Sequence, residues 1–267
     1  MATYVYGIAH ADHPDPEQQV LGIGDPPRPV RIVRAGELAA VVSDCPEDLR
    51  PKRRDLLAHQ HVLTETGSAG AVLPLRFGSL SADDDAVLGA LGEHTEHYKA
   101  QLAELTGRVE FNVKAAHREE AVLRLVVDDE PEVRRLTEAL QSAGGGSYPE
   151  RVRLGELVAN GVRAREVRDA HTIEQTLAPL AERSAPGPEG SGWLVNLSFL
   201  LPREDSASFT EAAHRLAEAE PHLELLVNGP LPPYSFVRTV HAAMDGQADG
   251  QTGGRAGERP HEKSVQG

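Results

Sequence analysis

The stretch Val109-Glu-Phe-Asn-Val-Lys-Ala115 decides how the chain divides. Apolar and polar side chains alternate along it, with Val109, Phe111 and Val113 on one side and Glu110, Asn112 and Lys114 on the other. Because alternate residues of a strand point to opposite faces of a sheet, this period of two predicts a strand with one buried face. A long helical pattern ends at Thr106-Gly107, just before it. We therefore expect the strand to open a second domain, with the hinge immediately upstream.

Patterns on the two sides of this strand divide the chain into three parts. We expect an N-terminal α+β domain over residues 1–107, a C-terminal α+β domain over residues 108–240 and a tail over residues 241–267. The tail is rich in Gly, Gln, Asp and Glu and has almost no apolar residues. It cannot bury enough apolar surface to offset the entropy of ordering, so we expect it to be disordered.

The N-terminal part shows short apolar runs separated by turn residues. Strands are predicted over residues 4–8, 30–33, 37–42 and 71–78, and helices over residues 53–68 and from an acidic cap at 81–85 to Leu105. Pro74 lies inside the last strand run, which predicts an edge strand or a bent strand, because proline cannot donate a ladder hydrogen bond. In the first helix, Leu56, Leu57 and Leu63 form the apolar side.

The C-terminal part continues with further strand and helix patterns. Helices are predicted from Pro131 and over residues 152–177 and 206–219, strands over residues 193–201 and 222–228, and a Pro/Gly loop over residues 185–192. The apolar run over residues 121–127 fits either a strand or the start of a helix. The order of these elements favours an antiparallel sheet covered by helices, of the ferredoxin-like kind.

Charge and composition argue against several classes of function. The net charge is −14, whereas nucleic acids and anionic membranes attract clustered Lys and Arg, so neither is an expected partner. The single cysteine, Cys45, allows no internal disulfide and fits a reducing cytosol. The first residues lack the basic and apolar regions of a signal peptide, and no apolar run approaches membrane-spanning length.

Local motifs do not predict a catalytic, cofactor or metal site. His94 and His97 are one helical turn apart and could chelate a metal, but His-Thr-Glu-His is not a zincin spacing, and a half-buried, hydrogen-bonded His94 is the favoured alternative. Gly22-Ile-Gly24 is followed by Asp-Pro-Pro instead of a helix start, so a dinucleotide fingerprint is excluded. No serine lies in a Gly-x-Ser-x-Gly elbow. We therefore expect a protein that is not an enzyme and needs no cofactor.

Four segments together resemble the gas vesicle F/L protein family (GvpF/GvpL). They are Tyr4-Val-Tyr-Gly-Ile8, Leu73-Pro-Leu-Arg-Phe-Gly78, the stretch over residues 109–115 and Gly229-Pro-Leu-Pro-Pro-Tyr-Ser-Phe-Val237. The resemblance implies two α+β domains, the second ferredoxin-like. It also implies a minor component and assembly accessory of gas vesicles, the buoyancy organelles of the cytoplasm. Such a chaperone-like protein would bind the hydrophobic major shell protein, limit its aggregation during nucleation, and contact other accessory proteins.

Two segments are the expected partner-binding surface. In the segment over residues 229–237, Pro232 and Pro233 would hold the chain extended while Tyr234 and Phe236 project from it. The favoured alternative is a packed crossover that covers the sheet edge. Arg76, beside Phe77, could bind a partner's carboxylate, but an internal ion pair is the favoured alternative.

The second hypothesis for the function is a ligand-binding protein or enzyme with a pocket between the two domains. A deep cleft that holds Arg76, His94 and an acid of perturbed pKa would favour it. A shallow apolar groove would favour the gas vesicle hypothesis, in which apolar strips near 229–237 and along the helix over 152–177 cover the shell protein.

Overall fold

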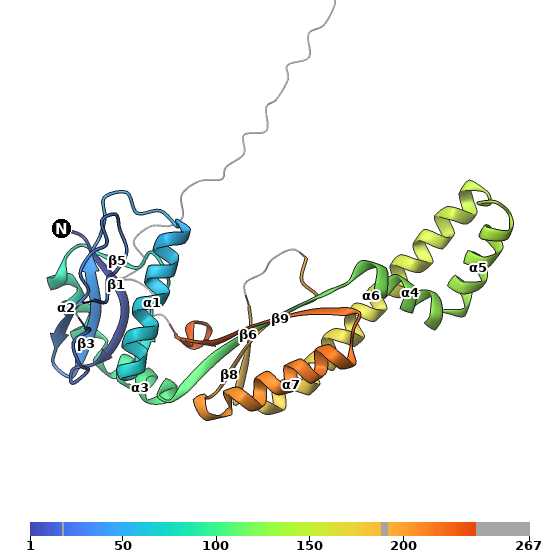
Figure 1. Cartoon of the computed structure of the whole chain (residues 1–267). Coiled ribbons are helices and arrows are strands. Elements are labelled where there is room, and N and C mark those ends of the chain that lie inside the picture. The colour runs from blue at the N-terminus through green and yellow to red at the C-terminus, as the bar shows by residue number, and fades with distance from the viewer. Residues whose placement is uncertain (18, 188–191, 239–267) are drawn as a thin grey trace, which may run out of the picture.

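Two antiparallel sheets with their helices make up the fold in the computed structural model (Figure 1). The structure describes residues 1–17, 19–187 and 192–238, so the tail expected over residues 241–267 lies outside the described residues. Within those ranges, no helix combines the length and the apolar character that crossing a membrane requires.

The first sheet is built around a central strand that is buried along almost its whole length. Its strands are β1 (Thr3–His10), β2 (Arg31–Ala35), β3 (Leu38–Asp44), β4 (Val72–Pro74) and β5 (Leu80–Ser81). The order is β2-β3-β1-β4, and β5 pairs with the beginning of β1. The predicted hairpin is therefore present as β2 and β3, and β4 is an edge strand, as Pro74 predicts.

Three helices cover this sheet: α1 (Arg53–Ala69), α2 (Asp84–Glu93) and α3 (Thr95–Leu105). The predicted apolar side of α1 is wrong in part, because Leu56 and Leu57 are 42% and 54% exposed. Instead, α1 buries a mixed stripe of Asp55, His59, Val62, Leu63 and Thr66. Its polar members are tolerated in the core because each makes a hydrogen bond there.

The single helix expected up to Leu105 is wrong, since the structure has two helices, α2 and α3, with a break at His94. This residue has φ −115° and ψ 25°, outside helical geometry. Gly92 lowers the helix propensity just before the break. The change of direction lets Leu91 of α2 and Tyr98 of α3 reach the same core.

The second sheet has the ferredoxin-like topology that the sequence predicts. Its strands are β6 (Arg108–His117), β7 (Arg183–Pro186), β8 (Val195–Pro202) and β9 (Leu223–Leu231), in the antiparallel order β7-β8-β6-β9. The register pairs Phe111 with Phe199 on the buried face and Asn112 with Ser198 on the other. Strand β7 is not predicted by the sequence pattern, and it begins two residues before the predicted loop. This strand is short and largely exposed, so it has no alternation of apolar residues.

Four helices belong to the second half: α4 (Glu119–Asp129), α5 (Pro131–Ser142), α6 (Tyr148–Leu177) and α7 (Ser206–Ala219). The ambiguous run over residues 121–127 is thus helical. Three short 3₁₀ turns are Ala178–Leu180, Arg203–Asp205 and Tyr234–Phe236. The C-terminal part of α6 and α7 cover one face of the sheet, with Ile173, Leu177 and Phe209 in the core. The first part of α6 packs with α4 and α5 into an arm that projects from the sheet (Figure 1).

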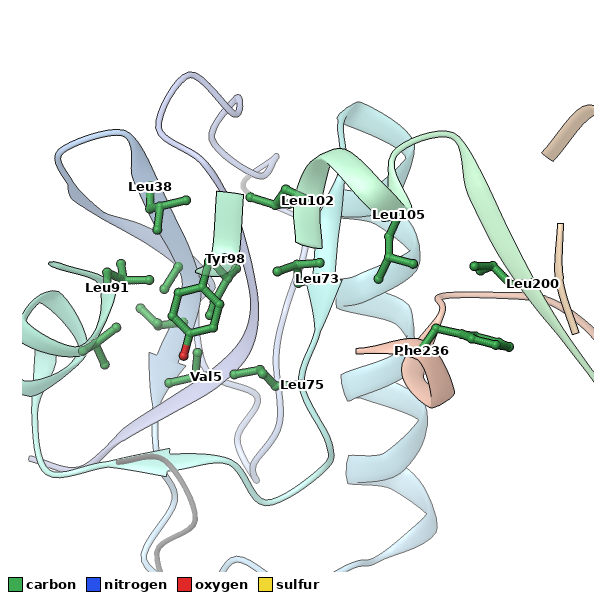
Figure 2. Packing of buried hydrophobic residues seen from close by; sticks show 14 residues of the cluster. Val5, Leu38, Leu73, Leu75, Leu91, Tyr98, Leu102, Leu105, Leu200 and Phe236 are labelled. Atoms are coloured by element: carbon green, nitrogen blue, oxygen red, sulfur yellow. The ribbon is translucent and has the colours of Figure 1, made fainter. Parts of the chain in front are cut away.

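One hydrophobic core is shared between the two halves. Val5, Leu73 and Tyr98 of the first half pack in one cluster with Leu200 of β8 and with Phe236 (Figure 2). The predicted division into domains over residues 1–107 and 108–240 therefore stays a prediction, although β6 does begin at Arg108.

Gly161 of α6 packs so closely against α4 that the arm leaves no room for a side chain there. A Cβ there would lie 2.6 Å from a methyl carbon of Val126 on α4, whereas nothing lies within 4 Å of a Cβ at Gly155 on the same helix. We expect Gly161→Ala to lower the free energy of unfolding by on the order of 1–3 kcal/mol through overpacking. Gly155→Ala should instead raise it by up to about 1 kcal/mol through helix propensity. Chemical denaturation of both variants checks this, and equal effects would contradict the packing argument.

Candidate functional site

The segment Pro232–Arg238, called here the C-terminal clasp, leaves the second sheet and returns to the first half of the molecule. It begins where β9 passes over a buried ring: a Cβ on Gly229 would lie 2.4 Å from Cδ1 of Phe111. Glycine therefore lets the strand run close to the core before it turns away. Every residue of the clasp from Tyr234 onward, apart from Val237, makes a polar or ring contact.

Phe236 is the apolar anchor of the clasp. Its side chain is 4% exposed and lies in the shared core with Leu75 and Leu200 (Figure 2). The guanidinium of Arg183 lies 5.3 Å from the centre of its ring, within cation–π range. The prediction that Phe236 projects toward a partner is therefore wrong for this arrangement of the chain, and the favoured packed crossover describes it better.

Ser235 ties the clasp to the second sheet through a buried carboxylate. Its backbone N–H and its hydroxyl donate to the two oxygens of Glu110, at 2.8 Å and 2.7 Å. Glu110 lies on β6 and is almost completely buried, so these hydrogen bonds offset part of the cost of removing its carboxyl group from water.

Arg238 ties the end of the clasp to α3. The side chain of Gln101 accepts from the Arg238 N–H at 2.6 Å and donates to its carbonyl at 2.8 Å. Nε2 of His97 lies 3.0 Å from the same carbonyl, and the Arg238 guanidinium pairs with Glu104 at 2.7 Å. Gln101 is buried, and its amide group holds both the N–H and the carbonyl of Arg238 by hydrogen bonds. His97 thus has a hydrogen-bonding role, and His94 packs edge-on against Tyr98.

Tyr234 and Phe77, two of the predicted partner-binding residues, meet at His59 of α1. The ring of His59 lies 6.4 Å from that of Tyr234 in a stacked orientation and 5.8 Å from that of Phe77, edge-on. Nε2 of His59 donates to the Leu75 carbonyl at 3.1 Å, so Nδ1 accepts from the Tyr4 hydroxyl at 2.9 Å. Burial lowers the pKa of His59 to about 4 and also raises the pKa of Tyr234.

Pro232 and Pro233 line a cleft between the two halves, with a volume of about 370 Å³. The end of α1 and residues 67–72 form the opposite wall, and Leu63 and Leu105 are among the apolar lining residues. Arg108 and Arg203 are its charged residues. No acid, histidine or cysteine lines this cleft, so it offers no group for general base catalysis. Neither Arg76 nor His94 lines it. The cleft therefore lacks the residues that the hypothesis of an enzyme or ligand pocket requires.

Arg76 is exposed on the connection between β4 and β5. The favoured internal ion pair is wrong, since no carboxylate of the described residues pairs with its guanidinium. Its backbone carbonyl accepts from Ser79 and closes the turn. The side chain is therefore available to a partner, and that role stays a prediction.

A second polar site, the Asp169 cluster, lies at the root of the arm and comprises Asp169, Arg165, His117 and His222. Nε2 of each histidine lies 2.8 Å from the same Asp169 oxygen, and Arg165 donates to the carboxylate at 3.0 Å. Burial raises the pKa of Asp169, but hydrogen bonds from the histidines and Arg165 outweigh it, so this pKa is lowered. No sequence motif predicts this cluster. One signal was available: Asp169 lies four residues before Ile173, on the buried stripe of α6.

Comparison with known proteins gives the class. The family model of the gas vesicle synthesis protein GvpL/GvpF matches residues 2–238. Gas vesicle protein F of Streptomyces sp. (strain CB03234) is 56% identical over 237 residues, covering 89% of this chain and 100% of the relative. Gas vesicle protein L1 of Halobacterium salinarum is 27% identical, over 80% of this chain and 82% of the relative.

The chain belongs to the GvpL/GvpF family of gas vesicle proteins. This membership confirms the resemblance seen in the sequence and the expectation of a gas vesicle protein that is not an enzyme. It also implies association with other gas vesicle proteins.

Two solved structures have the same fold. The crystal structure of GvpF from Anabaena sp. PCC7120 superposes with a TM-score of 0.71 at 24% identity, covering 90% of this chain and 99% of that one. GvpF from Microcystis aeruginosa gives a TM-score of 0.68 at 21% identity, with 89% and 99% covered. Both confirm the α+β fold with two antiparallel sheets.

Gln101 should control how firmly the clasp is held. We expect Gln101→Ala to lower the free energy of unfolding by roughly 1–3 kcal/mol, because it removes two hydrogen bonds of a buried side chain, one to the N–H and one to the carbonyl of Arg238. Amide hydrogen exchange of residues 232–238 should accelerate in the same variant. Gln175→Ala, at an exposed position on α6, is the matched control. Unchanged exchange in the clasp would refute the assigned role of Gln101.

His59 should make the stability depend on pH. Its lowered pKa means that the unfolded chain binds more protons between pH 6.5 and about 4, so stability is complete above pH 6.5 and falls as pH drops toward 4. The shift corresponds to a loss of roughly 3 kcal/mol. Urea unfolding at several pH values measures this. His59→Phe should flatten the profile, whereas the exposed His214→Gln should leave it as in the wild type. A profile equally steep in His59→Phe would exclude this histidine as the cause.

Proposed function

We propose that this chain is an assembly accessory protein of gas vesicles, located at the vesicle in the cytoplasm. It binds an apolar segment of the major shell protein and limits the aggregation of that protein while a vesicle nucleates. Membership of the GvpL/GvpF family supports the gas vesicle role. The cleft between the two halves is the observation that supports direct binding of an apolar segment.

The shape and chemistry of the cleft fit an apolar, extended or helical segment. One wall is made of small residues, Gly67 to Ala71, which let another backbone approach closely. The opposite wall is the run Pro230 to Pro233, whose three prolines carry no N–H, so it presents mainly apolar surface and carbonyl groups. Burial of apolar surface, the main driving force of protein association, would hold such a segment there.

Two exposed arginines, one at the cleft and one outside it, supply charged contacts in this proposal. Arg203, at the cleft, and Arg76, on the β4–β5 connection, are both exposed and could pair with carboxylates of the partner. The net charge of −14 keeps the complex dispersed, because like-charged particles repel each other. Other gas vesicle accessory proteins are further partners in this proposal.

The helix α6 is the second surface that the sequence analysis proposes for the shell protein. Val167 and Val152 are exposed on it, at 72% and 42%, whereas Ile173 and Leu177 of the predicted stripe are buried in the second core. Only the outer side of α6 is therefore accessible to the shell protein.

A co-expression assay tests the proposal. The major shell protein is produced alone and together with this chain, and its soluble fraction and co-elution on a sizing column are measured. We expect the wild type to raise the soluble shell protein and to co-elute with it. Ala69→Arg should abolish most of this effect, because it places a long charged side chain in the cleft at an exposed position.

Ala164→Arg is the matched control, at an exposed position of α6 away from the cleft. It should behave as the wild type. If the shell protein precipitates equally with and without the chain, direct binding is refuted. If Ala69→Arg and Ala164→Arg both retain activity, the cleft is not the binding site, and Val167→Glu then tests the outer side of α6.

A further inference from the structure

The Asp169 cluster has the ligand set of a metal centre. His117 ends β6, Asp169 lies on α6 and His222 immediately precedes β9, so three separate elements each bring one donor atom. The three atoms, Nε2, Oδ2 and Nε2, lie within 4.8 Å of one another. Ligands of a tetrahedral zinc ion at ~2.0–2.2 Å lie roughly 3.3–3.6 Å apart. Each histidine nitrogen, now 2.8 Å from Asp169 Oδ2, would therefore move slightly away from that oxygen to admit the ion. Two imidazoles and one carboxylate suit first-row transition dications.

The charge of the site is unbalanced in the direction that a cation would correct. Arg165 is within salt-bridge distance of three carboxylates: Asp169 at 3.0 Å, Asp129 at 3.3 Å and Glu220 at 3.6 Å. Three carboxylates share one guanidinium, so the carboxylates exceed the arginine by two negative charges, and their other neighbours in the cluster are the two histidines. Asp169 is 4% exposed, so solvent does little to screen its charge.

The surroundings of the ligands complete such a centre. Nδ1 of His222 lies 3.6 Å from Glu220, the position of the carboxylate that commonly orients a metal-bound imidazole. Arg165 can keep its bridges to Asp129 and Glu220 when Asp169 turns its oxygens to a metal. His117 lines an open groove of about 590 Å³ together with Trp193 and Val167, and this groove gives an ion a path from solvent.

We propose that His117, Asp169 and His222 bind one divalent transition-metal ion, with Zn²⁺ as the expected species and water completing its coordination. The ion joins the end of β6, the middle of α6 and the beginning of β9, and so fixes the arm at its root. This is a structural role, independent of the proposed binding of the shell protein in the cleft.

Binding of Co²⁺ and Zn²⁺ to the untagged full-length chain, after treatment with a chelator, tests the proposal. We expect one ion per chain, visible ligand-field bands with Co²⁺, and a higher melting temperature with Zn²⁺. Asp169→Asn and the double variant His117→Gln/His222→Gln should each weaken binding at least tenfold. His61→Gln/His214→Gln, at two exposed histidines outside the cluster, should bind as the wild type does.

Arg165→Gln separates a metal centre from a purely hydrogen-bonded cluster. It removes a competing cation and should therefore tighten Co²⁺ binding several-fold, whereas a cluster without a metal role would only lose stability. Circular dichroism shows whether each variant is folded. If the wild type binds neither ion more tightly than His117→Gln/His222→Gln does, or if Arg165→Gln weakens binding, the proposal is overturned.

Discussion

The return of the chain end to the first half is the constraint on which the rest of the structure depends. Each sheet has its own helices and most of its own core, so the two halves are joined mainly where Phe236 and Leu200 enter the first core. Burial of these apolar side chains stabilises the contact. The hydrogen bonds from Ser235 to Glu110 and from Arg238 to Gln101 fix the orientation of the chain there. Neither would specify the arrangement alone.

This constraint also shapes the cleft. One of its walls is the end of β9 and the start of the clasp, and the other is the end of α1. The distance between the walls is therefore set by the contacts of residues 234–238, which lie further along the chain and outside the cleft. The segment that the sequence suggests as an exposed partner surface therefore acts mainly inside the molecule. Phe236 and Tyr234 hold the two halves together, and Pro232 and the buried Pro233 line the cleft.

The sequence predicts what local periodicity encodes. Alternation along residues 109–115 and 193–201 predicts β6 and β8, and the order of elements predicts the ferredoxin-like half, because these signals lie within single segments. Two features depend on packing partners that are distant in sequence. One is the break between α2 and α3 at His94, and the other is the face of α1 that is buried, which contains His59 and not Leu56. The Asp169 cluster is also invisible to motif reasoning, since its donors are more than 50 residues apart. Its buried aspartate on the α6 stripe was the one local sign.

The helix α6 has 30 residues and belongs to two bodies at once. Its last turns are embedded under the second sheet, whereas its first turns carry α4 and α5 (Figure 1). At ~1.5 Å per residue it is a rod of roughly 45 Å. Asp169, which lies on this helix, joins it to the second sheet through His117 and His222. A load applied to the tip of the arm, by a growing assembly for example, would reach the sheet as torque about that point instead of being absorbed by a flexible loop.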